Sequence, residues 1–503
     1  MPKVNNKALL QSIPSVDKIL NWQEIKAFEN KIEHAYLTEI IRYKTDEFRG
    51  MLLKGETLES DHLKQMIVDE LNYLTHRYFT YAINALGIVL HTGLGRAPYA
   101  SGICEIVSDV AKAYSRLQID PEGKRDDRYK KISKLLQILT GAEAGIVVNN
   151  NAGATLLILR AIAQGKEVIV SRGQLIEIGG SFRIPDIMAQ SGCIMREVGT
   201  TNRTHLKDYE QAIKIHHRGT EAQRKNKKKI KVEDSLEPET GAIIRVHQSN
   251  YQITGFTKEV SLKELVALGK KYKIPVIDDL GSGALIDFSK YNLPKEPMVK
   301  ESIQAGADVV CFSGDKLIGG PQAGIIVGKK ELIEKIKKHP LTRALRCDKL
   351  TNAVLEATLQ MFLHKEADLV KEHTVFSILM KPLEEIKKDA EKFAEDLIKE
   401  HGDKLSVKVK PGKSEIGGGS LSTKELDTYV VAIMPKDLPQ KHRDTEKKSD
   451  LGGLTAQTLA KLLRQYKIPI FGRVQADSLI LDFRTILVGE NEIILQAFKD
   501  ILK

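Results

Sequence analysis

Apolar residues in the first part of the chain recur at the spacing of amphipathic helices. They do so between residues 32 and 52, ahead of Gly55, and again between residues 63 and 74. Ser60 stands before the second run and is a residue type suited to an N-cap. The pattern predicts a separate helical unit over residues 1–75.

A different pattern follows, in which short β-branched runs alternate with helical stretches from about Ile83 to Leu345. The runs are Gly145–Val148, Glu167–Val170, Ala242–Val246, Pro275–Ile277, Val309–Phe312 and Gly324–Val327. Alternation of this kind is typical of an α/β domain with a mostly parallel sheet. We therefore expect an α/β core over residues 76–350.

The remaining residues, 351–503, predict a long helical linker and a small α+β domain. The helical pattern covers Thr351–Glu400. Strand patterns at Leu405–Val409, Thr428–Ile433 and Ser478–Asp482 and a helical pattern at Thr455–Tyr466 follow it. Two polar tracts, His216–Thr240 and Lys436–Gly453, are typical of insertions or loops.

The composition is that of an ordinary globular protein. Of 503 residues, 42% are hydrophobic and 28% are charged, enough for a large core shared by two to four structural units. Met1–Leu20 lacks the apolar stretch of a signal peptide, and nowhere do about 18 apolar residues follow one another. The four cysteines form no CxxC pair, so neither a disulfide framework nor a zinc site is indicated. We expect a cytoplasmic protein with reduced thiols and no membrane partner.

The net charge of +11 would suit a polyanionic partner such as RNA. Much of the excess lies in the lysine-rich run Arg224–Lys231, which is typical first of a solvated loop and only second of a nucleic-acid contact. Charges in the N-terminal unit nearly balance. Charge alone therefore does not identify a partner.

The first segment that can carry chemistry is Gly145–Thr155, a buried strand that runs through a polar turn into a helix over Leu156–Ala163. A helix N-terminus with small residues presents unpaired N–H groups and the positive end of the helix dipole, which suits a phosphate. Asn150, Asn151 and Ala152 are the candidates. A simple Asn-rich cap explains the same residues equally well.

The second segment, Ile274–Gly283, is an apolar strand that ends in two carboxylates, Asp278 and Asp279. Ligands of open α/β sheets bind at this edge. A carboxylate there can pair with a protonated pyridine nitrogen, and Asp279 is our choice. A helix cap or an acidic metal-binding turn remains an alternative.

The third segment, Val309–Pro321, is a strand that delivers Ser313 and then Lys316 onto a glycine-rich turn. A lysine desolvated at a sheet edge beside other cations has a lowered pKa and can act as a nucleophile or base. A lone lysine in a loop is usually only solvated. The order of a phosphate turn, an acidic strand end and a Ser-x-x-Lys segment resembles the site of aspartate-aminotransferase-type enzymes that use pyridoxal 5′-phosphate (PLP).

Over nearly its whole length the chain resembles the bacterial selenocysteine synthases, the L-seryl-tRNA(Sec) selenium transferases. The matching stretches are Ile13–Asp17, Asn84–Pro98, Ser171–Arg203 with Glu177–Arg183 inside it, the Asp279 and Lys316 segments, Leu341–Arg346, Gly417–Ser420 and Gly472–Arg473. So many long motifs in the same order are highly specific.

The resemblance implies a fold-type-I PLP enzyme in which Lys316 holds the cofactor as a Schiff base. The serine of a seryl-tRNA(Sec) would displace Lys316, and the freed amine would serve as base for the α-proton. Loss of the β-hydroxyl would give an aminoacrylyl-tRNA, to which selenium from selenophosphate adds. His247, at another strand end, could face the cofactor or be an ordinary hydrogen-bonded histidine.

The family also implies an anion site at Arg96, Arg343 and Arg346, since guanidinium groups suit phosphate geometry. Arg343 and Arg346 would share one helix face if that segment is helical. Surface ion pairs with Asp348 or Glu356 are the alternative. Asp315, beside the lysine, could assist proton transfer or only orient the turn.

The resemblance further implies a homodecamer, a ring built from dimers, in which the N-terminal unit helps to hold the tRNA. Asp126 stands where the family usually has Gly, Ala152-Gly153-Ala154 replaces a run of alanines, and the insertion at 216–240 is long. A PLP-dependent lyase of the same superfamily, acting on a small phosphorylated amino compound, is the alternative function. A catalytically silent RNA-binding protein is a third, against which Ser313, Asp279 and Lys316 argue.

Overall fold

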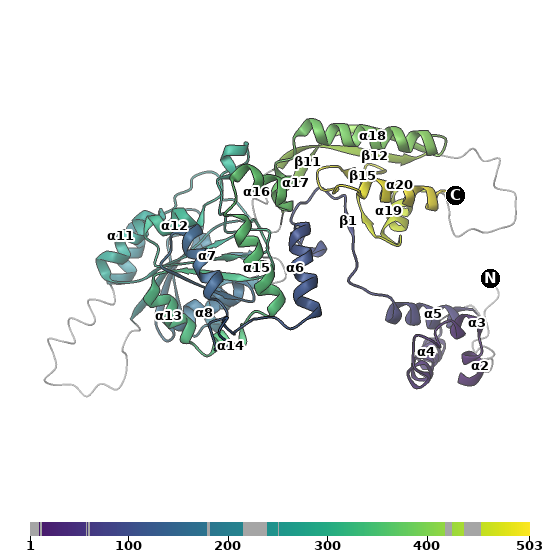
Figure 1. Ribbon diagram of the computed structural model, residues 1–503, viewed down its shortest axis with the longest axis horizontal. Coiled ribbons are helices and arrows are strands. Elements are labelled where there is room, and N and C mark those ends of the chain that lie inside the picture. The colour runs from purple at the N-terminus through teal and green to yellow at the C-terminus, as the bar shows by residue number, and fades with distance from the viewer. Residues whose placement is uncertain are drawn as a thin grey trace. The chain divides into compact units, whose positions relative to one another are not determined.

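The computed structural model describes residues 10, 13–56, 58, 61–178, 182–214, 239–249, 251–417, 425–436 and 454–503. The chain forms two compact units, Met1–Ala82 and Ile83–Lys503 (Figure 1). Several predicted features lie outside the described residues: the lysine-rich run and nearly all of the 216–240 insertion, most of the 436–453 tract, and Gly418–Ser420 of the glycine motif.

The first unit is a small helical bundle. Its helices are α2 (Val16–Leu20), α3 (Gln23–Lys26), α4 (His34–Leu53) and α5 (His62–Thr75). Leu37 and Ile41 of α4 and Ile67 and Leu71 of α5 are fully buried, so the i, i+4 pattern of the sequence forms the core. The residue before α5 is Asp61, and not Ser60 as predicted, and its side chain makes no capping bond. Ser60 itself lies outside the described residues.

The second unit is organised around a seven-stranded sheet of order β2-β10-β9-β8-β7-β3-β6. The strands are β2 (Ala144–Val148), β3 (Glu167–Ser171), β6 (Ile194–Val198), β7 (Thr240–Val246), β8 (Val276–Gly281), β9 (Val309–Ser313) and β10 (Gly324–Gly328). Only β10 runs antiparallel to its neighbours. The predicted mostly parallel α/β fold is confirmed.

Helices cover both faces of this sheet (Figure 1). They include α7 (Lys130–Thr140), α8 (Asn151–Ala163), α11 (Leu262–Tyr272), α12 (Val299–Ala305) and α13 (Lys330–Lys338). Neighbouring residues of β7 serve opposite faces: Ile243 packs into the cluster that includes α11, and Ile244 into the one that includes α8. Burial on both faces explains why these strands are nearly continuous apolar runs.

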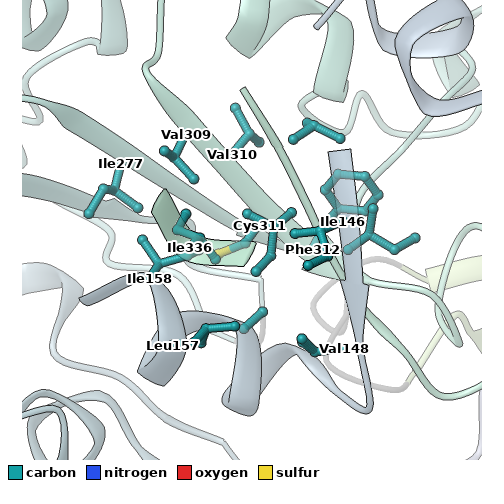
Figure 2. Packing of buried hydrophobic residues seen from close by; sticks show 14 of the residues in the cluster. Ile146, Val148, Leu157, Ile158, Ile277, Val309, Val310, Cys311, Phe312 and Ile336 are labelled. Carbon is teal, nitrogen blue, oxygen red and sulfur yellow. The ribbon is translucent and has the colours of Figure 1, made fainter. Parts of the chain in front are cut away.

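The larger cluster lies between α8 and the central strands. Figure 2 shows Leu157 and Ile158 of α8 on one side, with Ile277 and Cys311 among the strand residues they approach. Each of these side chains is at most 1% exposed. Burying one such aliphatic side chain stabilises the fold by about 1.5–3 kcal/mol, so this layer fixes where α8 begins relative to the strand ends.

The predicted long helix over Thr351–Glu400 is wrong in detail, because four helices occupy it: α15 (Lys349–Met361), α16 (Glu366–Glu372), α17 (Thr374–Leu379) and α18 (Leu383–His401). Pro382 stands at the N-cap of α18, where its ring is compatible with a helix start and not with a helix interior. The four helices turn the chain toward the C-terminal domain.

The C-terminal domain is a four-stranded antiparallel sheet covered by helices. Its strands are β11 (Leu405–Glu415), β12 (Glu425–Pro435), β14 (Arg473–Gln475) and β15 (Ser478–Asp482), in the order β11-β12-β15-β14. Helices α18, α19 (Ala456–Arg464) and α20 (Glu490–Ile501) pack on it through a single apolar cluster.

Residues 83–96, which we call the strap, join this domain to the large sheet. Its strand β1 (Ile83–Asn84) pairs in parallel with β13 (Ile470–Phe471). The N–H groups of Val89 and Leu90 then donate to the carbonyls of Glu415 and Ile416 at 2.9 and 2.8 Å. Gly87 has a φ of +78°, and a Cβ there would lie 2.0 Å from the Asp482 carboxylate. The strap is therefore fixed along the C-terminal sheet before it reaches Arg96.

Among the described residues, no helix is long and apolar enough to cross a membrane. The four cysteines are free.

Candidate active site

A cavity of about 260 Å³ lies at the carboxyl edge of the large sheet, in front of the N-terminus of α8. The predicted site residues that border it are Arg96, Asn150, Asn151, Ala152, His247, Asp279, Ser313, Asp315 and Lys316. Residues from five separate stretches of sequence thus meet in one place. The topology explains this, because the carboxyl ends of parallel strands share one edge.

Lys316 is buried in this cavity and only 4% exposed. Burial lowers the pKa of its amine, and the nearby Arg96 charge lowers it further, while Asp315, Asp279 and Glu296 oppose the shift. A lysine whose pKa falls has a larger neutral fraction, and the neutral amine is the nucleophilic and basic form.

A tight turn fixes the backbone of Lys316. The N–H of Gly319 donates to the Lys316 carbonyl at 2.9 Å, and Gly320 donates to Gly314 at 2.9 Å. Gly319 has a φ of +66°, and a Cβ there would lie 2.2 Å from Cε1 of His373. Backbone conformation and lack of space both require glycine at this position.

His373 of the α16–α17 junction supports the turn from behind. It is 3% exposed, and its Nε2 lies 2.8 Å from the carbonyl of Ile318. Burial lowers the pKa of this imidazole to about 4, so the ring is neutral near pH 7. Because a carbonyl can only accept, Nε2 carries the proton and donates it.

Asp279 is the buried carboxylate of the cavity, 4% exposed. It accepts hydrogen bonds from Asn151 Nδ2 and Thr155 Oγ1, both at 2.9 Å, and from the N–H of Gly281 at 3.1 Å. Burial raises its pKa, and these hydrogen bonds oppose the increase. The neighbouring Asp278 instead pairs with Arg245 at 3.0 Å and does not border the cavity. Of the two carboxylates left open by the sequence, only Asp279 faces the site.

Helix α8 begins at Asn151 and not near Leu156, so the predicted polar turn is the first turn of the helix. Asn150 is the N-cap, and its side chain accepts from the N–H of Gly153 at 2.8 Å. Asn151 Oδ1 is buried without a partner in the described part of the protein. The first N–H groups of the helix have no intrahelical acceptor and face the cavity with the positive end of the dipole.

Together these groups fit pyridoxal 5′-phosphate. The helix start and Ser313 match a phosphate, the buried Asp279 matches a protonated ring nitrogen, and the Lys316 amine matches the aldehyde carbon. Among the described residues, no group of three or more His, Cys, Asp or Glu could hold a metal ion.

Arg96 reaches this cavity through an unusual backbone. Its φ is +64°, a conformation that non-glycine residues rarely adopt and that is commonest at functional sites. Its guanidinium pairs with Asp315 at 2.8 Å. The strap therefore holds a cation beside Lys316 and orients the carboxylate next to it.

Arg343 and Arg346 do not border the cavity and are exposed. Helix α14 (Leu341–Ala344) ends before Arg346, so the two arginines do not share a helix face as the spacing predicted. Neither alternative ion pair forms among the described residues: Asp348 caps α15, and Glu356 pairs with Lys131. The Leu345 carbonyl accepts from the N–H of Asn149 at 2.9 Å, which ties this segment to the start of the phosphate turn.

The structure adds residues that the sequence did not single out. Thr155 contacts Asp279, and its position four residues after Asn151 on one helix could have revealed it. Glu296 is 3% exposed, accepts from Ser282 at 3.0 Å and lies 3.6 Å from Nε2 of His247. No local sequence pattern marks Glu296, because it lies in a loop.

Residues 82–219 and 214–487 match the family model described as SelA: L-seryl-tRNA selenium transferase. The L-seryl-tRNA(Sec) selenium transferase of Alkaliphilus oremlandii is 42% identical over 510 residues, covering 99% of this chain and 100% of the relative. That of Carboxydothermus hydrogenoformans is 43% identical over 488 residues, covering 96% and 95%.

Among solved structures, a D-glucosaminate-6-phosphate ammonia-lyase is similar in fold, with a TM-score of 0.50. It is 18% identical, and the alignment covers 84% of this chain and 96% of the lyase. At that identity the likeness shows a shared fold and nothing about the substrate.

Proposed function

The chain belongs to the L-seryl-tRNA selenium transferase family, and from this membership and the site we propose that it converts serine carried on tRNA(Sec) into selenocysteine. Its cofactor is pyridoxal 5′-phosphate. The observation that carries the assignment is the buried Lys316 beside Asp279 and the N-terminus of α8.

We assign the cofactor contacts as follows. The first turn of α8 at Asn150, Asn151 and Ala152, with Ser313, binds the phosphate, while Asp279 pairs with the ring nitrogen. Asn151 and Thr155 hold Asp279 in place through their hydrogen bonds. When bound, pyridoxal 5′-phosphate supplies an electron sink for the carbon that loses its proton.

Lys316 then moves the proton. Its Nζ accepts the proton from the α-carbon of the seryl group and passes it to the β-hydroxyl, which departs as water. The selenium of selenophosphate then bonds to the β-carbon, and Nζ relays the proton from selenium to the α-carbon. Water cleaves the bond between selenium and phosphorus and releases phosphate. The lowered pKa of Lys316 keeps part of the amine neutral for the first of these steps. Asp315, held by Arg96, orients the turn that carries the lysine.

The selenium donor of the proposal is selenophosphate, an anion that needs cations. Arg96 is the guanidinium that the chain itself brings to the cavity. Arg343 and Arg346 lie outside it and are exposed, so in our proposal they join the anion site of a neighbouring copy within a homodecamer. The proposed location is the cytoplasm, with the helical unit of residues 1–75 contacting the tRNA.

The decisive experiment compares Lys316→Ala with Lys413→Ala, an exposed lysine on β11, in the full-length protein. Lys413→Ala should retain covalently bound cofactor, read from its absorbance and from the mass after borohydride reduction, and should convert seryl-tRNA(Sec) with selenophosphate. Lys316→Ala should lose both. A covalent adduct that persists in Lys316→Ala would refute the assignment of the lysine.

A second experiment tests the substrate. The wild-type protein should bind serylated tRNA(Sec) more tightly than ordinary seryl-tRNA. Equal affinity for the two would favour a small-substrate lyase.

A further inference from the structure

A second cavity, of about 380 Å³, lies directly behind one wall of the lysine cavity. The wall is the loop after β7: His247 and Ser249 border the lysine cavity, while Gln248 between them borders the second one. Gln248 Nε2 donates to the carbonyl of Gly173 at 2.6 Å, which fixes the loop. The same loop therefore borders both spaces.

The lining of this second cavity is rich in amides and hydroxyls. We call it the amide cleft. Its charged lining residues are Arg203, Lys258 and Glu259, and its uncharged polar ones are Ser171, Thr201, Asn202, Thr204, Gln248, Gln252 and Thr257. Groups that both donate and accept hydrogen bonds suit the edges of nucleobases and the hydroxyls of ribose. A volume near 380 Å³ falls within the range of roughly 300–1,000 Å³ typical of small-ligand sites.

Backbone pairing makes the cleft rigid. Two loops form it, and the N–H of Thr204 donates to the Lys258 carbonyl at 2.9 Å, while the N–H of Lys258 donates to the Asn202 carbonyl at 3.0 Å. Asn202 Nδ2 also donates to the Phe256 carbonyl at 2.7 Å. The site is thus held in shape before any ligand arrives, which reduces the entropy lost on binding.

Phe256 lies in one of these loops and is 89% exposed. One exposed aromatic ring is ordinary by itself. Phe256 does not itself border the cleft, but its carbonyl accepts from Asn202, which does. An aromatic ring next to amide groups is the combination that single-stranded RNA sites use, because every base has a face that can stack.

Basic side chains extend from the cleft along the surface. A hollow of about 960 Å³ on the other side of residues 199–204 is bordered by Arg172, Arg196, Arg203 and Lys207, with Glu197 and Asp208 as its acids. Arg203 borders both spaces. In the described part of the chain, Arg203 and Lys207 make no ion pair, whereas Arg172 pairs with Glu197. Unpaired cations beside a base-sized cleft suit a phosphate backbone.

We propose that the amide cleft, with Phe256 and Arg203, binds the unpaired 3′ end of the RNA that carries serine. This inference rests on the proposed function and deepens it. Because the amino acid is esterified to the terminal ribose, the last nucleotide must lie within a few bonds of the reacting serine. A nucleotide in the cleft would do so, with the seryl group extending past Ser249 to Lys316.

The test measures binding of two RNAs, intact tRNA(Sec) and tRNA(Sec) lacking its last three nucleotides, to the full-length cofactor-loaded protein. Phe256→Ala should weaken binding of the intact RNA about 5- to 150-fold, the loss expected for one base stack, and leave binding of the truncated RNA unchanged. Phe256→Trp should restore affinity. Tyr114→Ala, which removes another fully exposed ring, should change neither.

Arg203→Ala gives an independent test, through the dependence of RNA binding on salt concentration. It should reduce the slope of log K against log salt for the intact RNA by about 0.7 in magnitude, the value for one phosphate contact on a single strand. The truncated RNA should show the same slope with wild type and with Arg203→Ala.

Three results would overturn the inference: no effect of Phe256→Ala, an equal loss for both RNAs, or a change of oligomeric mass in Phe256→Ala that marks the cleft as a protein contact. A failure of the proposed function looks different, because wild-type protein would then not convert seryl-tRNA(Sec) at all.

Discussion

Gly319 offers a quantitative test of how the turn that carries Lys316 is held. In Gly319→Ala, a Cβ is added at a φ of +66° and 2.2 Å from the ring of His373. A left-handed conformation costs a non-glycine residue about 1–2 kcal/mol. The ring must also move, which breaks its 2.8 Å bond to the Ile318 carbonyl and leaves a buried acceptor unpaired, at about 1–3 kcal/mol. The free energy of unfolding should fall by about 2–5 kcal/mol.

Gly165→Ala is the matched control. Gly165 has a φ of +72°, and a Cβ there would meet no atom within 4 Å, so that substitution carries the backbone cost alone. Both variants are followed by urea unfolding, with cofactor absorbance as a second readout, because only Gly319→Ala displaces the turn of Lys316. Repeated in a His373→Ala background, Gly319→Ala should cost no more than Gly165→Ala. Equal destabilisation by the two glycine variants in the wild-type background would refute the steric argument.

Three further substitutions test His373 and two other buried polar groups. The fold favours the neutral form of His373, so this residue contributes its full share to the free energy of unfolding above pH 6.5 and loses it as the pH falls toward 4. Over that window, urea unfolding of the wild type should show a loss of free energy of unfolding about 3 kcal/mol larger than that of His373→Phe. Thr155→Val removes a hydrogen-bond donor to the Asp279 carboxylate and should raise the dissociation constant of the cofactor about tenfold, measured by fluorescence titration. Thr358→Val, which removes a hydroxyl that donates to the Val354 carbonyl, should leave this constant unchanged. Arg484→Met leaves the carbonyls of Ile378, Leu379 and Asp427 without their buried donor and should lower the free energy of unfolding by about 3 kcal/mol or more. Arg464→Met, at an exposed arginine, should have little effect. Similar urea midpoints for the two variants would contradict this prediction.

Buried strands were the most predictable part of the fold. Runs such as Val309–Phe312 are apolar on both faces, and five of the six strands predicted for the large sheet begin and end within two residues of the observed ones. The sixth, Pro275–Ile277, ends four residues before β8 does. Strand β6 gave no such signal, because it lies at the sheet edge and its sequence includes Arg196 and Glu197. Thr351–Glu400 is helical, as predicted, but it is divided into several helices. Apolar spacing alone does not show where one helix ends and the next begins.

Some residues of the site could likewise be predicted from the sequence and others could not. Lys316, Asp279 and Asn150 stand at strand ends or at a helix start, so the rules of α/β sheets point to them. Arg96 and Asp315 are 219 positions apart, and no local pattern brings them together. The resemblance to a known family placed Arg96 near the lysine, and it could not show that Arg346 lies beyond the end of its helix.

The strap has a consequence for how the protein is made. Its pairing partners, Ile470 and Phe471, are synthesised almost 400 residues after Ile83, so β1 stays unpaired until those residues have been made. Domains generally fold in order as they emerge, and the large sheet is complete by Gly328. The contacts that hold the strap, and with it Arg96, therefore form after the large sheet. A nascent or prematurely terminated chain would carry a formed lysine pocket without its arginine, and so would be kept from acting on a scarce aminoacylated RNA.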